Sequence, residues 1–305
     1  MLKYLIIMLD DTSVSYCHYQ NPRTEHRLMP LDMLKKAIFF AMKENINIQF
    51  VYPDYNLPQE YVDAINTIDH TDIVPAGRKG DVVVCSWDNL AEEGVVALRT
   101  TRSELFARYA EIADALSSKE RINVIVTDLE KMNESDFESY KTILTALAER
   151  VKALYAEGKS PQLNILTDRM MLSAMNNCNA GWESITLAPD GKFYVCPAFY
   201  LEPDGYSVGD LEAGLDIKNP QLYQLKFAPI CRECDAYHCR RCVWLIRKTT
   251  LEVNTPSHEQ CVVAHLERNA SRNLRASIRA IGQFLPEANI PEINYLDPFD
   301  NINRK

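Results

Sequence analysis

The sequence lacks both an excess of basic residues and any long hydrophobic run. Its 305 residues contain 33 Lys and Arg against 42 Asp and Glu, which gives a net charge of −9 at pH 7. Because phosphate binding relies on a basic surface, this charge argues against nucleic acid as the main partner. The opening stretch MLKYLIIMLDD is too short to span a bilayer and lacks the features of a secretory signal. We therefore expect a cytoplasmic protein without a membrane partner.

Disulfides are not expected either, because the cytosol keeps thiols reduced. The sequence nevertheless holds nine cysteines, and seven of them lie between Cys178 and Cys261. In cytosolic proteins, clustered cysteines are more often metal ligands or catalytic thiols than disulfide partners. Of the other two, Cys85 follows the apolar run DVVV and is predicted to be a buried strand residue.

The first 170 residues alternate apolar runs with amphipathic stretches. The predicted strands are Lys3–Leu9, Ile46–Tyr52, Asp81–Ser86, Val95–Arg99, Arg121–Thr127 and Gln162–Thr167. The predicted helices are about Leu31–Glu44, Pro58–Ile68, Ser103–Ser118 and Ser135–Glu157. Short strands separated by helices of this length favour parallel β–α units, in a partial six-stranded (β/α) barrel or a doubly wound sheet. The segments Ile68–Lys79 and Trp87–Glu93 are assigned to loops.

Aspartates follow several predicted strands: Asp10, Asp11, Asp54, Asp128 and Asp168. In (β/α) barrels, catalytic residues gather at the carboxyl ends of strands. Aspartates at these positions are also ordinary turn and N-cap residues, and we favour this interpretation. The alternative is an active site over the strand ends that uses Cys17, Asp128 and Asp168.

The chain changes character after Asp168. Between Cys178 and Cys261 it is rich in loops, with predicted strands at Ser184–Leu187 and Phe193–Cys196 joined by an Asp190–Gly191 turn. The stretch TPSHEQ then begins a helix that runs to about Phe284, with Ser257 and Gln260 forming a capping box. The predicted organisation is a barrel over residues 1–170, a cysteine module with its helix over 171–285, and a tail over 286–305.

The stretch CRECDAYHCRRC, residues 231–242, holds Cys231, Cys234, Cys239 and Cys242. Zinc and iron–sulfur clusters both accept four thiolates. A zinc ribbon usually places about 15–20 residues between its two C-x-x-C pairs, whereas only residues 235–238 intervene here. This crowding favours iron–sulfur clusters, with seven thiolates dividing into four plus three. Zinc is the alternative, with His238, His258 or His265 as additional ligands.

The spacing of the seven cysteines resembles the SPASM domain, which ends many radical S-adenosylmethionine enzymes that mature ribosomal peptides. Cys178-x12-Gly191-x4-Cys196 fits the family pattern C-x9–15-G-x4-C, and CRECDAYHCRRC is one residue shorter than C-x2-C-x5-C-x3-C in two intervals. The resemblance implies two auxiliary [4Fe-4S] clusters. Cys178, Cys196 and Cys242 would hold the first, whose fourth position is open or filled by an unidentified ligand. The second would be held by Cys231, Cys234, Cys239 and Cys261.

Two landmarks of a working radical enzyme are missing. Such an enzyme carries C-x3-C-x2-C after its first strand, but the loop here reads DDTSVSYCHYQNP, with Asp10 and Val14 at the first two positions and only Cys17 left. The family's Gly-Gly-Glu after the second strand is replaced by FVYPDY. We therefore expect neither binding nor cleavage of S-adenosylmethionine. In this the chain resembles the CXXX repeat peptide maturases, which lack the N-terminal cluster motif and are associated with cysteine-repeat peptides.

Three functions follow from these features. The leading hypothesis is a peptide-maturation protein that binds a cysteine-containing precursor peptide or an active radical S-adenosylmethionine partner and keeps its auxiliary clusters. Those clusters could hold the fold together, ligate a substrate thiol at an open iron or relay electrons, with Arg240 and Arg241 tuning their potential. The second hypothesis is a non-redox peptide- or protein-binding module with structural zinc. The third is the strand-end active site, and the sequence leaves open whether the chain is an enzyme.

Overall fold

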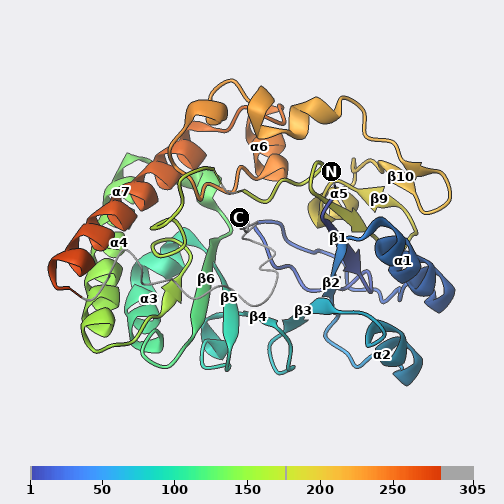
Figure 1. The fold of residues 1–305 in the computed structure, drawn as a ribbon, viewed down its shortest axis with the longest axis horizontal. Coiled ribbons are helices and arrows are strands. Elements are labelled where there is room, and N and C mark those ends of the chain that lie inside the picture. Colours follow the sequence, from blue (N-terminus) through green and yellow to red (C-terminus); the bar gives the residue numbers. More distant parts are fainter. Residues whose placement is uncertain (1, 176, 283–305) are drawn as a thin grey trace.

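The computed structural model describes residues 2–175 and 177–282 and shows an α/β fold (Figure 1). Its helices are α1 Leu31–Glu44, α2 Gln59–Ile65, α3 Arg102–Ala115, α4 Glu134–Ala156, α5 Pro197–Leu201, α6 Val243–Thr250 and α7 His258–Ala280. The capping box at Ser257 and Gln260 is present at the start of α7, as predicted. The predicted tail over 286–305 and the predicted helix end at Phe284 lie outside the described residues.

The described strands form one curved sheet of nine strands in the order β7-β6-β5-β4-β3-β2-β1-β8-β9, and a separate two-stranded ribbon. Neighbouring strands of the large sheet are parallel, except that β9 runs antiparallel to β8. The strands are β1 Tyr4–Met8, β2 Asn47–Val51, β3 His70–Pro75, β4 Val82–Cys85, β5 Val95–Thr100, β6 Arg121–Val126, β7 Gln162–Leu163, β8 Ser184–Leu187, β9 Phe193–Tyr194, β10 Gly209–Asp210 and β11 Gly214–Leu215.

The helices α1 to α4 lie on the outer side of the curved sheet, and α7 packs alongside α4 (Figure 1). Like α7, helices α3 and α4 begin at side-chain caps, whereas α1 and α2 follow a proline without such a cap. Thr101 and Glu104 form a capping box at α3, and Asn133 and Asp136 form one at α4. Each box satisfies backbone N–H groups that the first turn of a helix leaves without partners. The connections between strands are therefore set locally, which favours the parallel β–α arrangement.

The strand count is the main difference from the sequence prediction. The sequence analysis placed a loop over Ile68–Lys79, but His70–Pro75 forms β3 between β2 and β4. Its polar residues His70, Thr71 and Asp72 hide the apolar signal, because only Ile73 and Val74 follow them before Pro75. The predicted strand Gln162–Thr167 is reduced to two residues in β7, since the chain turns after Leu163.

A buried ion pair connects β6 to the turn that follows β7. Arg121 is 1% exposed, and its guanidinium donates to both carboxylate oxygens of Asp168, at 3.0 and 2.5 Å. The same side chain donates to Asn123 and Gln162. A charge this deeply buried is tolerated only when it is paired and hydrogen-bonded. Asp168 therefore has a structural role, which agrees with the preference for a turn residue over a catalytic one.

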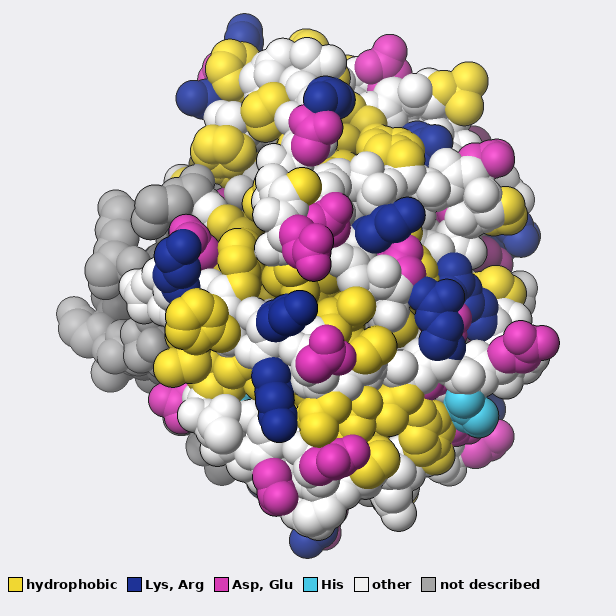
Figure 2. All heavy atoms as spheres, turned by 90° about the vertical axis from the view of Figure 1, so that its right-hand side faces the viewer, with side chains coloured by type: hydrophobic (Ala, Val, Ile, Leu, Met, Phe, Trp, Pro, Cys, Tyr) yellow, Lys and Arg dark blue, Asp and Glu magenta, His cyan; other side chains and the backbone are white. Residues whose placement is uncertain are grey.

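The surface mixes apolar and charged side chains. Figure 2 shows the side of the molecule that carries α1 and β10, where patches of apolar side chains lie between charges of both signs. On α1 the exposed apolar residues are Phe39 and Met42, which are 68% and 59% exposed. Among the described residues, none of the helices has the length and apolar character needed to cross a membrane.

Replacing Arg121 tests the buried ion pair. We expect Arg121→Met to lower the free energy of unfolding by about 3–5 kcal/mol, because it leaves the Asp168 carboxylate buried without its partner. Urea unfolding monitored by circular dichroism measures this loss. The control is Lys141→Met, which removes an exposed lysine paired with Glu138 and should cost at most about 1 kcal/mol. Equal losses for the two variants would contradict the assignment.

Candidate metal centres

The first group of cysteines surrounds a buried cavity of about 60 Å³. Cys178, Cys196 and Cys242, which the resemblance assigns to one cluster, all line this cavity. Cys196 and Cys242 are the residues that immediately precede α5 and α6. Cys17, from the loop after β1, lines the same cavity and makes a fourth thiol. The structure therefore brings together the three predicted residues and adds one from the other end of the chain.

The second group surrounds a separate cavity of about 280 Å³. Its cysteines are the four that the resemblance assigns to the second cluster, namely Cys231, Cys234, Cys239 and Cys261. Three of them come from the loop region before α6, and Cys261 lies on the first turn of α7. The Sγ atom of Cys234 lies 3.5 Å from Nε2 of His265, which also lines this cavity. The partition suggested by the resemblance thus corresponds to two places in the fold.

Burial makes several of these thiols weaker acids than usual. It raises the pKa of Cys239 and of Cys242 to about 12 and that of Cys231 to about 11. Burial also raises the pKa of Cys17 and Cys196 well above the usual value, and neighbouring cysteines add to the effect. These five thiols, when free, are therefore protonated at neutral pH. A bound metal reverses this, because its positive charge deprotonates the thiols that coordinate it.

Arg241 provides an independent test of whether an anionic group fits here. The residue is 3% exposed and adopts a left-handed backbone conformation with φ of 49°. Within the described residues, its Nε and Nη2 atoms have no hydrogen-bond partner. It lines the second cavity, and its charge lowers the pKa of Cys231 and Cys178 against the effect of burial. A buried cation calls for anionic partners, and thiolate-held clusters would provide them on both sides.

The distances between the sulfur atoms help to distinguish a site for a cluster from a site for a single metal ion. Four thiolates on one zinc ion at about 2.3 Å lie about 3.8 Å from one another. Among the described residues, only Cys234, Asp235 and His265 place three metal-ligating atoms within 4.8 Å of one another. In each group the four thiols are therefore spread around a cavity and do not converge on one point. This arrangement fits a cofactor of several atoms.

The three histidines proposed as additional zinc ligands are in different environments. His265 faces the second group. His238 is buried with its Nε2 atom 3.3 Å from Asp168, and burial lowers its pKa to about 3. His258 is exposed and lies 3.8 Å from Glu134. Only His265 is therefore placed to act with the second group of cysteines in the way that the zinc alternative requires.

The strand-end aspartates are engaged in local interactions. Asp128 accepts a hydrogen bond from the backbone N–H of Arg102 at 2.7 Å and lies 3.5 Å from its guanidinium. The Asp168 carboxylate faces Arg121, and Cys17 lies in the first cysteine group. Asp54 is exposed. The structure therefore gives separate surroundings to the residues that the third hypothesis combines, and the hypothesis gains no support from it.

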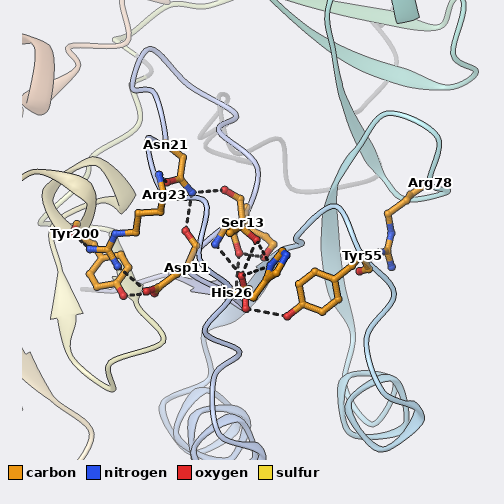
Figure 3. A network of polar contacts seen from close by, with 11 residues as sticks. Asp11, Ser13, Asn21, Arg23, His26, Tyr55, Arg78 and Tyr200 are labelled. Atoms are coloured by element: carbon orange, nitrogen blue, oxygen red, sulfur yellow. Dashed lines mark hydrogen bonds and ion pairs between the residues drawn. The ribbon is translucent and has the colours of Figure 1, made fainter.

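The loop after β1 is held by a polar network, which Figure 3 shows. Asp11 pairs with Arg23 at 3.0 Å and accepts a hydrogen bond from the Tyr200 hydroxyl of α5. Asn21 donates to the backbone carbonyls of Asp11 and Ser13 at 2.8 and 2.9 Å. This network ties the two ends of the loop to each other and to the helix that follows Cys196.

Asp10, at the first position of the missing cluster motif, belongs to the same region. Its carboxylate accepts hydrogen bonds from Thr12 and from the Tyr55 hydroxyl, and Nδ1 of His26 lies 3.5 Å away (Figure 3). Burial opposes ionisation of Asp10, but these hydrogen bonds outweigh it and lower the pKa of the carboxyl. The position is thus occupied by a satisfied carboxylate.

Comparison with known proteins shows a likeness of fold alone. No family model and no curated protein matches the chain. The structure of "native anSMEcpe with bound AdoMet" aligns with a TM-score of 0.62 and 10% sequence identity, over 92% of this chain and 100% of that one. A second anSMEcpe structure, with AdoMet and the Cp18Cys peptide, has the same TM-score and identity over 93% of this chain and 100% of that one. The fold of this chain is therefore similar to that of anSMEcpe.

A weaker likeness is found to SuiB from Streptococcus suis bound to precursor peptide SuiA, with a TM-score of 0.47 and 11% identity over 73% of this chain and 64% of that one. The similarity to anSMEcpe confirms the predicted fold class, which is an α/β fold with a mostly parallel curved sheet, a cysteine-rich region and a C-terminal helix. The division at residue 170 and the roles of the individual cysteines stay predictions.

The sequence predicts seven of the eight grouped cysteines as metal ligands. It does not predict that the eighth, Cys17, lies beside three of them. Cys17 was read as the last trace of a missing motif, because no spacing rule connects it to cysteines in the second half of the chain. Arg99 was also missed. It donates from β5 to the backbone carbonyls of Cys17 and Tyr19, and an arginine inside a predicted strand gave no sign of this.

Replacing Arg23 tests the network that holds the loop after β1. We expect Arg23→Leu to lower the free energy of unfolding by about 1–3 kcal/mol, because it removes the partner of the Asp11 carboxylate and a hydrogen bond to the Tyr200 carbonyl. Denaturant unfolding measures the change. Arg27→Leu, at an exposed position of the same loop, is the matched control and should change stability by less than about 0.5 kcal/mol. A network of no energetic importance would give the same result for both.

Proposed function

We propose that this chain is a peptide-maturation protein that binds a cysteine-containing precursor peptide, or an active radical S-adenosylmethionine partner. It carries an iron–sulfur cluster at each of its two cysteine groups and does not cleave S-adenosylmethionine itself. The observation that carries the proposal is the arrangement of eight thiols as two groups of four around separate cavities. The fold of anSMEcpe, which has been solved with bound AdoMet and the Cp18Cys peptide, supports the proposal by analogy.

The residues around the first group favour a cluster that is shielded from water. Tyr16 and Trp244 line the cavity together with the four cysteines, and Tyr16 is 2% exposed. Backbone N–H groups of Trp244 and Leu245 bond to the Cys242 sulfur and favour its thiolate form. When bound, an iron–sulfur cluster supplies one-electron transfer, and its potential depends on such hydrogen bonds and on solvent exposure. The chain therefore provides donors and apolar walls suited to that cofactor.

The loop after β1 supports the loss of S-adenosylmethionine cleavage. In Figure 1 this loop runs from β1 across the inside of the curved sheet towards β5 and β6. Its residues contact those strands, since Arg99 of β5 donates to the Cys17 carbonyl and His18 Nδ1 lies 2.9 Å from the Val126 carbonyl of β6. The loop thus occupies part of the interior with its own side chains, and two of its three motif positions lack a thiol.

A peptide has a place to bind beside both groups. An open depression of about 500 Å³ is lined by Asn177 and Asn179, on either side of Cys178, and by Arg232 and Glu233, between Cys231 and Cys234. Trp182 also lines it and is 36% exposed. Amide and charged side chains around an exposed tryptophan suit an extended peptide, whose backbone needs donors and acceptors. We assign the precursor peptide to this surface.

Zinc is the second candidate for the cysteine groups. The observation in its favour is that Cys234, Asp235 and His265 lie close enough to ligate one ion. Asp235, however, is paired with Arg268 and with Arg272, the latter at 2.9 Å. These pairs neutralise the carboxylate and make it a poorer ligand. We therefore favour clusters at both groups.

Metal analysis of anaerobically purified protein tests the proposal. We expect about eight irons and eight sulfides per chain, and a double substitution of Cys231 and Cys234 by Ser should lower both to about half. Inductively coupled plasma analysis and sulfide assay measure the contents. The control is Cys85→Ser, in a buried strand residue outside both cavities, which should keep the full content. About one or two zincs without sulfide, or unchanged metal and unchanged peptide maturation in the double variant, would overturn the proposal.

The absence of S-adenosylmethionine cleavage is tested separately. We expect the reconstituted protein, reduced with dithionite and supplied with S-adenosylmethionine, to form no 5′-deoxyadenosine above the level of a protein-free sample. The physical reason is that Asp10 and Val14 cannot supply the two missing thiolates. Chromatography with mass detection measures the product. Formation of about one or more equivalents per chain would show that the barrel retains the chemistry.

A further inference from the structure

We propose that Cys17 is the fourth thiolate of the first cysteine group, so that a cluster bound there has no open iron. This inference rests on the proposed function, because it takes the first group to hold an iron–sulfur cluster. The resemblance to the SPASM domain leaves that position open, and the cysteine comes from the loop in which the S-adenosylmethionine-cleaving motif has been lost. The inference thus assigns Cys17, the one cysteine that remains of the C-x3-C-x2-C motif, to the cluster of the first cysteine group.

The position of Cys17 is the first argument. It lines the same cavity as Cys178, Cys196 and Cys242, and Ile6 from the middle of β1 lines it too. The loop after β1 therefore turns back over its own strand. All four thiols thus line one cavity, and four cysteine thiolates are the usual ligands of a [4Fe-4S] cluster.

The anchoring of the loop is the second argument. Arg99 donates to the carbonyl of Cys17 at 3.0 Å and to the carbonyl of Tyr19 at 2.5 Å. Between them, Nδ1 of His18 lies 2.9 Å from the carbonyl of Val126, within hydrogen-bond distance. Strands β5 and β6 thus hold the loop at Cys17 and at the two residues that follow it. A sulfur fixed in this way is preorganised to ligate a cofactor.

The walls around Cys17 are the third argument. Tyr16 and Tyr19 are 2% and 3% exposed, and their rings pack edge to face at 5.8 Å. Both line the cavity beside the four thiols. The two rings thus form part of the wall around the thiols. Among the residues that line this cavity, Cys17 provides the only thiol besides Cys178, Cys196 and Cys242.

Closure by Cys17 limits what the first cluster can do. A [4Fe-4S] cluster with four protein thiolates has no vacant position for a substrate thiol or for S-adenosylmethionine. Three roles were considered for the clusters. The first cluster can then have only two of them, namely electron transfer and stabilisation of the fold. A precursor peptide would be recognised by protein side chains and would not be bound to iron at this centre.

The oxidation behaviour of the cluster tests the inference. A cluster held by three thiolates loses its unsupported iron on mild oxidation: [4Fe-4S]²⁺ gives up one electron to ferricyanide and releases Fe²⁺, which leaves a paramagnetic [3Fe-4S]⁺. We expect oxidised wild-type protein to show little of this signal in electron paramagnetic resonance. Cys17→Ser should show about one spin per chain, or should lose the iron of one whole cluster. The controls are Cys85→Ser and Gln20→Ala, the latter at an exposed position of the same loop, and both should behave as wild type.

The failure of this inference can be told apart from failure of the proposed function. If wild-type protein holds about eight irons and already gives the [3Fe-4S]⁺ signal, or if Cys17→Ser keeps its iron and gives the wild-type spectrum, then Cys17 is not a ligand although the clusters are present. If wild-type protein contains no iron or sulfide, the proposed function fails first. Loss of iron in Gln20→Ala equal to that in Cys17→Ser would attribute the effect to the loop and also overturn the inference. Circular dichroism checks that each variant is folded.

Discussion

The pairing of β1 with strands on both of its edges joins the two parts of this chain. β1 lies parallel to β2 on one side and to β8 on the other, with Tyr4 in register with Asn47 and with Ser184. Its residues Leu5, Ile7 and Met8 are fully buried. Because β8 lies between Cys178 and Cys196, this one pairing brings both of those thiols to the strand whose following loop carries Cys17. The first cysteine group is therefore a product of sheet topology, not of a compact sequence motif.

The second cysteine group shows the opposite relationship between sequence and site. Cys231, Cys234 and Cys239 are close in sequence, and the resemblance predicted that they act together with Cys261, while it assigned Cys242 of the same stretch to the first group. The same reasoning could not place Cys17. The other thiols of its group come close to it only through the pairing of β1 with β8, which the sequence does not specify. Helix α1 and strand β8 have the predicted bounds, since regular apolar patterns mark both. Strand β3 was missed because polar residues fill its first half.

Charge explains why the cysteine region can combine many thiols with several arginines. Burial keeps the free thiols protonated, and the same burial leaves the Arg241 guanidinium with nitrogen atoms that find no partner among the described residues. A buried guanidinium without partners is costly. A bound iron–sulfur cluster would remove this cost, because its iron ions deprotonate the coordinating thiols and the resulting thiolates give the guanidinium opposite charges. Under the proposed function, the stability of the cysteine region is therefore strongly linked to the cofactor.

The positions of Cys17 and Cys261 near opposite ends of the chain have a consequence for biosynthesis. The ribosome releases Cys17 first, but the first group lacks a member until Cys242 has emerged, and the second is incomplete until α7 has begun. Helix α7 is then fixed against α4 through Glu267, which accepts from Tyr140 and Arg169 at 2.7 Å each. Under the proposed function, loading of either centre is thus a late step that follows synthesis of nearly the whole chain. Until then, the nascent protein must keep its early thiol reduced and unoccupied.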